Sequence, residues 1–122
     1  MFADPAALTI NAVAKNLVKI NQDGYSSEYL LRSTTDEFRL RIRNASRTEK
    51  ASGIKIDRHN VELIQTVFGT APAPNVTRKV YVVIENQQGD TLTDPTNVAV
   101  GLLSWLTASS AANITKLMNF ES

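Results

Sequence analysis

The chain has 122 residues, 43% of them hydrophobic and 20% charged, which is the composition of one globular domain and not of a disordered or fibrous protein. Its 13 basic and 12 acidic residues nearly cancel, so the net charge of +1 gives no argument for nucleic-acid binding. The absence of cysteine excludes disulfides and thiol chemistry.

Nothing in the sequence predicts a secretion signal or a membrane anchor. The start, MFADPAALTI, lacks a basic region and a long apolar core, and no segment approaches the roughly 18 apolar residues of a membrane span. We therefore expect a protein made in the cytoplasm, with no membrane partner. A domain this small buries only about two thirds of its unfolded surface, so dimerisation would be a natural supplement.

Residues 7–20 predict a β-hairpin, with apolar residues alternating at Leu8 and Ile10 and recurring from Leu17 to Ile20. Residues 12–20 taken alone are also compatible with one or two helical turns. Asp23-Gly24 indicates a turn with positive φ. Residues 25–33 then predict a strand.

The segment EFRLRIRN, residues 37–44, alternates without a break and predicts a strand with one buried and one exposed face. Phe38, Leu40 and Ile42 form its apolar side, and its polar side is a row of arginines. Neighbours in that row lie roughly 6.6 Å apart, so their charges need a negative counterpart. Two counterparts remain open: carboxylates of neighbouring strands, namely Glu28, Glu37, Asp57 and Glu85, or a phosphate backbone.

Residues 45–52 are polar and aperiodic, which predicts a loop. Alternation returns at residues 53–57, with Lys55 and Asp57 on the exposed side, and it falters at residues 58–60, which predicts a bulge before residues 61–68. Residues 69–75 form a loop with two prolines. Residues 78–85, RKVYVVIE, predict another strand, with Val80 and Val82 facing inward.

From residue 94 the period changes to that of a helix. Asp94 is a suitable N-cap and Pro95 fits the first helical position. Residues 98, 99, 102, 103, 105 and 106 form a broad apolar stripe. Ser109 or Ser110 can cap a second, shorter helix. The sequence therefore predicts an α+β domain, in which two C-terminal helices (residues 94–120) cover one face of an antiparallel meander (residues 25–85).

No catalytic, metal or cofactor site is predicted. His59 is the only histidine, and no cysteine or carboxylate cluster surrounds it at ligand spacing. Glycine-rich phosphate loops and nucleophile elbows are also absent. We do not expect an enzyme, a cofactor or a small-molecule substrate.

The order of these segments, from the leading hairpin through EFRLRIRN, GIKID and RKVYVVIE to DPTNVAVGLLSWL, resembles the coat proteins of the single-stranded RNA bacteriophages, the leviviruses. The resemblance implies the RNA bacteriophage capsid protein fold: an N-terminal hairpin, a five-stranded sheet, and two helices that pack on the partner subunit's sheet. It also implies a homodimer that assembles into an icosahedral capsid in the virion after synthesis in the bacterial host. The inward sheet face would bind genomic RNA, including a hairpin whose binding represses translation of the replicase.

The resemblance also implies roles for single residues. Those expected to contact RNA are Arg39, Arg41, Arg43, Lys55, Asp57, Lys79, Tyr81, Val83 and Glu85. Those expected in the dimer interface are Val98, Leu102, Leu103, Trp105, Leu106, Ile114 and Leu117. The loop between dimers would contain Gly69, Pro72, Pro74 and Asn75. Val83 departs from the polar base-contacting residue of some members, and no cysteine is present to cross-link the shell. The alternative is a non-viral dimeric β-sheet RNA-binding module that does not assemble.

Overall fold

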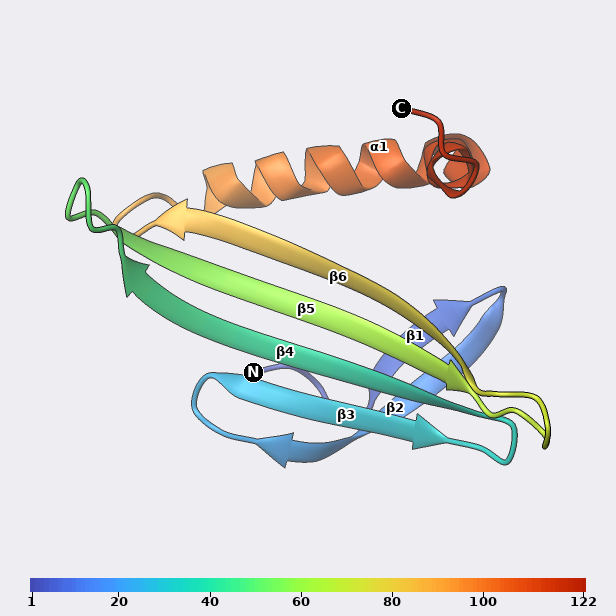
Figure 1. Ribbon diagram of the computed structural model, residues 1–122. Helices are drawn as coiled ribbons and strands as arrows, with labels where there is room; N and C mark the ends of the chain where they lie inside the picture. The colour runs from blue at the N-terminus through green and yellow to red at the C-terminus, as the bar shows by residue number, and fades with distance from the viewer.

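The computed structural model describes residues 1–122 as one antiparallel sheet followed by a helical arm (Figure 1). The elements are β1 (Ala6–Ile10), β2 (Val13–Gln22), β3 (Ser26–Arg32), β4 (Asp36–Thr48), β5 (Lys55–Val67), β6 (Val76–Gln87) and α1 (Thr93–Met118). Strands that follow one another in the chain are neighbours in the sheet, so β1 and β6 are its two edges. The predicted α+β order of strands followed by helix is confirmed.

The predicted hairpin and five-stranded sheet merge into one six-stranded sheet, because β2 belongs to both. The first half of β2 pairs with β1, ending at Ile10 opposite Val13, and its second half pairs with β3 from Val18 opposite Leu30. The register shifts between Lys19 and Asn21, within the part of β2 that pairs with β3. In Figure 1 the β1–β2 hairpin is steeply inclined to β4, β5 and β6.

The core is small and lies between the hairpin and the middle of the sheet. Its five buried hydrophobic residues are Leu17, Tyr29, Phe38, Leu40 and Ile42. Residues of β1 pack against this cluster from one side, and the Tyr29 hydroxyl donates a hydrogen bond to the Ala3 carbonyl oxygen (3.0 Å). The apolar side predicted for residues 37–44 is therefore confirmed as the centre of the core.

Strands β4 and β5 are longer and more regular than predicted. β4 continues to Thr48, through half of the predicted loop, and β5 pairs with it from Lys55 to Val67 with no register shift. The predicted bulge at residues 58–60 is therefore wrong. Its polar residues fit the sheet because neighbouring strands supply partners: the ring nitrogens of His59 lie 2.7 Å from Asn44 Oδ1 and 3.1 Å from Asn86 Oδ1.

The turn between β2 and β3 is held by a side chain and not by a glycine with positive φ. The Asp23 carboxylate accepts hydrogen bonds from the backbone N–H groups of Tyr25 (2.9 Å) and Ser26 (2.7 Å), which lowers the pKa of Asp23. Gly24 does not have the predicted positive φ. Left-handed residues occur instead at Asn11 (φ 51°) and Ala12 (φ 61°), in the two-residue turn between β1 and β2.

The helical arm begins earlier than predicted and bends in its second half. Asp94 lies in the first turn, where its backbone N–H donates to Thr91 Oγ1 (3.2 Å) and its carboxylate accepts from that hydroxyl (2.8 Å). The N-cap position predicted for Asp94 is therefore wrong: Leu92 occupies it without a side-chain cap bond, and Thr91, one residue earlier, accepts from the Asp94 N–H. Four residues, Ala108–Ala111, have non-helical backbone angles, so Ser109 and Ser110 form the bend and not a helix cap. Asn113 Nδ2 donates to the Trp105 carbonyl oxygen (2.8 Å) across this bend.

By length and composition alone α1, with 26 residues, is long and apolar enough to cross a membrane. The expectation that no segment approaches this composition is therefore wrong. The bend, however, ends the first straight part at Thr107. Residues 93–107 span only about 22 Å at 1.5 Å per residue, which is shorter than the roughly 30 Å of a bilayer core.

Candidate nucleic-acid interface and assembly surface

The register of the sheet separates its side chains into two faces, because directly paired residues point to the same side. One face, called the hydrophobic face, carries Tyr29, Phe38, Leu40, Ile42, Val61, Leu63, Val80, Val82 and Ile84. The opposite face, called the arginine face, carries Glu28, Arg32, Glu37, Arg39, Arg41, Arg43, Arg47, Arg58, Asn60, Glu62, Lys79, Tyr81, Val83 and Glu85.

The centre of the arginine face is an ion cluster of β3 and β4. Glu28 Oε1 lies 2.5 Å from Arg39 Nη1 and 3.3 Å from Arg41 Nε. The hydrogen bond from Arg39 is the largest cause of a lowered pKa of Glu28, and the same bond raises the pKa of Arg39. These side chains are only about a quarter to a third exposed, which makes the cluster less screened than a surface ion pair.

The remaining carboxylates of this face each contact at least one cation. Glu37 lies against Arg32 and is 3.7 Å from Arg39 Nη2. Glu62 Oε1 forms an ion pair with Lys79 Nζ (3.0 Å). Glu85 contacts Arg47 and Arg58 at 3.5 and 3.7 Å. Three of the four carboxylates predicted to balance the arginines do so, while Asp57 lies on the other face and Glu62 takes its place.

Positive charge still prevails on this face. Its seven cations stand against four carboxylates, an excess of +3 in a chain whose net charge is +1. Arg43 is the one cation of the face with no carboxylate within 4.0 Å. It is paired directly with Ser26 and Asn60. The Tyr81 ring, 60% exposed, lies nearby on β6 with Lys79 Nζ 5.4 Å from its centroid.

Seven of the nine residues expected to contact RNA share this face, and two do not. Lys55 is paired with Thr48 and Asp57 with Ser46, both on the hydrophobic face, and Ser46 Oγ donates to Asp57 (2.6 Å). The predicted orientation of Lys55 and Asp57 is wrong because it assumed a bulge at residues 58–60, which would have reversed the alternation. The strand from Lys55 to Val67 is unbroken, so Arg58, Asn60 and Glu62 lie beside the arginines instead.

The second surface feature is a large apolar area on α1 and β6 that nothing in the chain covers. No α1 residue is buried. Val80 is 64% exposed and Trp105 is 58% exposed. Five of the expected interface residues are exposed, namely Val98, Leu102, Leu103, Trp105 and Leu117, while Leu106 and Ile114 are half-buried.

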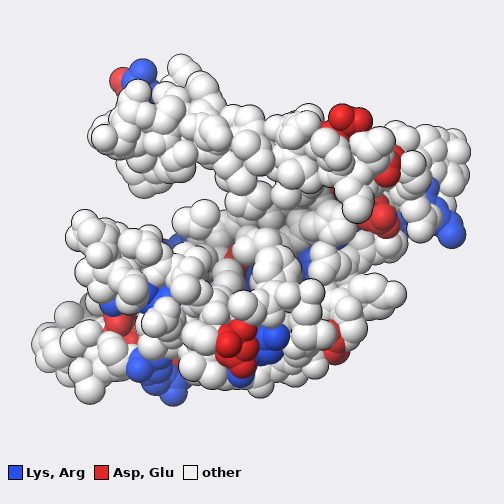
Figure 2. All heavy atoms as spheres, turned by 180° about the vertical axis from the view of Figure 1, so that it is seen from behind, with Lys and Arg blue, Asp and Glu red and all other residues white.

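A groove of about 1070 Å³ separates the first part of α1 from β6. Val82 and Ile84 line it from the strand, and Ala99, Leu103 and Leu106 line it from the helix. Figure 2 shows the arm standing away from the sheet across a deep hollow, with few charged side chains along the arm. Such an exposed apolar surface is typical of an interface.

The accessible surface of the whole chain supports this interpretation. It measures 9172 Å², whereas a folded monomer of 13.4 kDa exposes about 6,500 Å². The difference of about 2,700 Å² per chain, or about 5,400 Å² for two chains, matches the largest obligate interfaces, which bury about 5,000 Å² or more in total for both partners.

The loop between β5 and β6 is closed by its own contacts. The Gly69 N–H donates to Asn75 Oδ1 (2.8 Å), and the Ala73 N–H donates to the Thr70 carbonyl oxygen (2.7 Å). A Cβ atom on Gly69 would lie 2.2 Å from the Ala73 carbonyl oxygen. The turn therefore requires glycine at this position, while Pro72 and Pro74 lie in the closed part of the loop.

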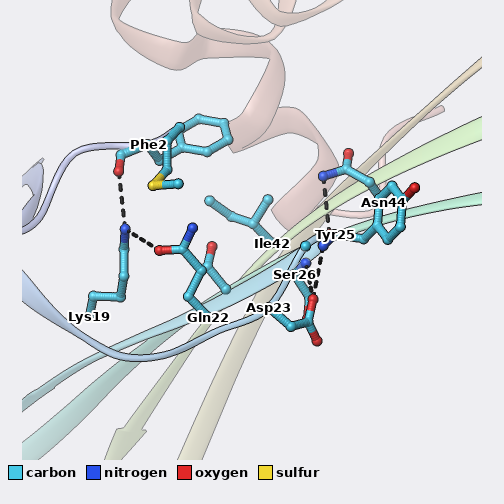
Figure 3. A pocket seen from close by; sticks show the side chains of 11 residues that line it. Phe2, Lys19, Gln22, Asp23, Tyr25, Ser26, Ile42 and Asn44 are labelled. Carbon is cyan, nitrogen blue, oxygen red and sulfur yellow. Dashed lines mark hydrogen bonds between the residues drawn. The ribbon is translucent and has the colours of Figure 1, made fainter.

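A smaller polar cavity of about 500 Å³ lies beneath the N-terminus (Figure 3). Its polar side chains bond one another or the backbone: Lys19 Nζ donates to the Phe2 carbonyl oxygen (3.2 Å) and to Gln22 Oε1 (2.9 Å). Asn44 Nδ2 donates to the Tyr25 carbonyl oxygen (3.2 Å). The bond from Lys19 fastens Phe2, near the N-terminus, to the sheet. No three His, Cys, Asp or Glu side chains gather where they could hold a metal ion.

Comparison with known proteins agrees with this geometry. The family model described as "Phage phiCb5, coat protein" matches residues 3–87. No curated protein sequence matches the chain.

Solved structures share its fold at low sequence identity. The coat protein of bacteriophage EMS014 is 16% identical, with 98% of this chain and 97% of that chain covered and a TM-score of 0.76. A virus-like particle of Beihai levi-like virus 21 is 13% identical, with 100% and 98% covered and a TM-score of 0.74. A virus-like particle of bacteriophage AVE019 is 12% identical, with 95% of each chain covered and a TM-score of 0.64.

Proposed function

The chain belongs to the phage phiCb5 coat protein family, and from this membership we propose that it forms homodimers that build an icosahedral shell around single-stranded RNA. Its role as a structural protein of a phage capsid follows from the family itself. The family also argues against the alternative of a non-viral binding module. The dimer and the RNA contacts are our proposals, and two surfaces of the molecule support them.

The observation that carries the dimer is that α1 has no buried residue. A 26-residue helix with an apolar stripe is packed only loosely in its own chain, with Leu106 and Ile114 half-buried, and helices in water depend on packing for stability. The uncovered half of the hydrophobic face, with Val61 and Val80 exposed, is an apolar surface of matching character. We therefore propose that α1 of each subunit packs on the partner's β5 and β6.

The edge of the sheet supports the same arrangement. β6 has a strand partner on one side only, so the backbone groups of its other side are free to pair. Pairing of β6 with its copy about a two-fold axis would join two sheets into one and place each α1 over the other subunit. The arginine faces of both subunits would then form one continuous surface on the side opposite the helices.

That continuous surface is the proposed RNA site. Seven cations per subunit, Arg43 free among them, provide the positive charge that phosphates require. The exposed Tyr81 ring is suited to stacking on an unpaired base. The site comprises Arg39, Arg41, Arg43, Lys79, Tyr81, Val83 and Glu85, and it excludes Lys55 and Asp57, which face the other way.

We extend the proposal to an RNA hairpin whose binding represses translation of the replicase. Single-stranded loops are the RNA elements that proteins read through stacked bases and exposed base edges. Tyr81 and Asn60 provide a ring and an amide on this face for such contacts. Val83 offers no hydrogen bond, so any discrimination between bases has to come from its neighbours.

Assembly and RNA content can be tested together. The protein is expressed alone in bacteria, and particles are examined by electron microscopy while the absorbance ratio at nucleic-acid and protein wavelengths is read on the same fraction. The proposal expects uniform closed particles that contain RNA. Monomers without particles across a range of salt would contradict the assembly, and particles free of RNA would contradict the RNA site.

The arginine face has its own test. Replacing Arg39 and Arg41 by alanine should lower the RNA content of particles and flatten the salt dependence of RNA binding, by about 0.7 in slope for each phosphate that the protein no longer neutralises. Replacing Lys55 by alanine, on the opposite face, is the matched control. An unchanged slope in the double variant would contradict the assignment of this face.

A further inference from the structure

We infer that Glu28 sets the RNA affinity of the arginine face, because its carboxylate occupies the place where a phosphate would bind Arg39 and Arg41. The inference rests on the proposed RNA-binding function and deepens it. It makes Glu28 a specificity-determining residue that restrains binding, and not a contact to RNA.

The geometry places one oxygen atom between two members of the arginine row. Glu28 is paired directly with Arg41 across β3 and β4, and Arg39 follows one step along the same face. Glu28 Oε1 accepts from both guanidinium groups, at 2.5 and 3.3 Å. A phosphate oxygen that bridged these arginines would need the same donors, so the carboxylate and the phosphate compete.

Glu28 is the one carboxylate of the face that bridges two arginines of the row. Glu37 contacts only Arg39 of the row, at 3.7 Å, and lies closer to Arg32. Glu85 contacts Arg47 and Arg58 at 3.5 Å or more, and all three side chains are about half exposed. Glu62 contacts Lys79. Ion pairs as exposed as those of Glu85 are weak and easily exchanged, whereas the Glu28 cluster is three-quarters covered on the carboxylate side.

Arg43 belongs to the same row as Arg39 and Arg41 but has no carboxylate partner. An RNA strand therefore meets one free arginine first, and it engages Arg39 and Arg41 only by displacing Glu28. Binding of any single phosphate is kept weak by this competition, while an RNA that presents several phosphates to the row gains all three arginines.

The test uses the full-length dimer, a fluorescently labelled single-stranded polyuridylate oligomer as probe, and fluorescence anisotropy over a range of potassium chloride. Glu28→Gln keeps the side-chain shape and removes the charge. We expect it to bind about tenfold more tightly near physiological salt with a similar salt slope, because the same arginines neutralise phosphates in both proteins but no carboxylate has to be displaced in the variant. Glu28→Asp keeps the charge and should stay near the unmodified protein.

Glu49→Gln is the matched control, since it changes the net charge equally from the loop between β4 and β5, where its side chain contacts no arginine. If Glu28→Gln and Glu49→Gln bind the probe with the same affinity, the inference is wrong and the RNA function stands. If the unmodified dimer shows no salt-dependent binding, the proposed RNA function itself is wrong.

A second pair of variants tests the inference should Glu28→Gln fail to fold. Arg43→Ala removes the free arginine, and Arg41→Ala removes one held by Glu28. We expect Arg43→Ala to lower the affinity several-fold more than Arg41→Ala. The reverse order would overturn the inference.

Discussion

The two halves of this sheet share the same alternating sequence pattern but differ in what covers them. In the first half, the β1–β2 hairpin covers β3 and β4, and all five core residues lie on β2, β3 and β4. In the second half, β6 and α1 have no buried residue, although their apolar content is as high. The first half is therefore covered by contacts from its own chain, while the second half lacks such contacts, which we propose that another copy supplies.

This difference assigns separate tasks to the two halves. The covered half holds Phe38, Leu40 and Ile42 in the core, which fixes Arg39 and Arg41 on the opposite side of the same strand. Two arginines of the proposed RNA site therefore lie on the strand that contributes three of the five core residues. The uncovered half exposes the apolar area that makes a lone subunit unfavourable in water. In the proposed function, folding, assembly and RNA packaging are thus linked through one sheet.

The largest expected effect is on the uncovered half. Replacing both Leu102 and Trp105 by Asp would place two charges in the proposed interface, and we expect soluble dimer and particles to be lost. Size-exclusion chromatography with light scattering measures the outcome. Ser104→Asp, on the same part of α1, is the control and should leave the dimer intact. A well-folded dimer of the double variant would mean that the apolar stripe does not meet the partner.

A core substitution tests the covered half. Phe38→Ala should lower the free energy of unfolding by about 3 to 5 kcal/mol, because it leaves a cavity among residues that cannot collapse into it. The midpoint of urea unfolding measures this loss.

Val80→Ala is the matching change in the uncovered half. The free energy of unfolding should fall little in a lone subunit, where Val80 is mostly exposed. Once a partner buries Val80, it should fall by up to about 3 kcal/mol, the value for burying a whole valine side chain. Its effect should therefore grow with protein concentration, because dimer stability depends on concentration. Equal effects of Val80→Ala at all concentrations would contradict this division between the halves.

The sequence predicted the covered half far better than the uncovered one. The alternation of residues 37–44 depends only on neighbouring strands, so Phe38, Leu40 and Ile42 were identified as core and the arginines as the opposite face. Residues 58–60 were misjudged because the partners that satisfy His59 come from β4 and β6, which one strand's pattern does not reveal. That single error placed Lys55 and Asp57 on the wrong face.

The bend of α1 shows another limit of sequence patterns. Polar Ser109 and Ser110 correctly marked the interruption of the helix, but they suggested a helix cap and not three left-handed residues in succession. The sequence predicts Asp94 as the N-cap, since aspartate and threonine both suit the start of a helix. In the structure Thr91 Oγ1 instead accepts from the Asp94 N–H, and only these hydrogen bonds distinguish the two residues.

A smaller effect is expected from acid on the ion cluster of β3 and β4. The pKa of Glu28 lies below its ordinary value of 4.5 in the folded protein. Its contribution to stability is therefore fully present above pH 4.5, and it is lost as the pH falls through the lower folded pKa. Unfolding free energies measured from neutral pH down into the acid range should decline less steeply for Glu28→Gln. An identical acid decline in both proteins would mean that Glu28 is not engaged by Arg39 in solution.

The smallest expected effect addresses the bend that shapes the uncovered half. Ser110 has φ 57° and ψ 42°, a left-handed conformation that costs a non-glycine residue about 1 kcal/mol. Ser110→Gly should therefore stabilise the dimer by up to about 1 kcal/mol, whereas Ser104→Gly, in the straight part of α1, should destabilise it by a similar amount. The unfolding midpoint at fixed protein concentration measures both. If the helix were straight in solution, both glycines would lie in a helix interior and both would destabilise. The sign of the Ser110→Gly effect thus decides whether the arm meets its partner already bent.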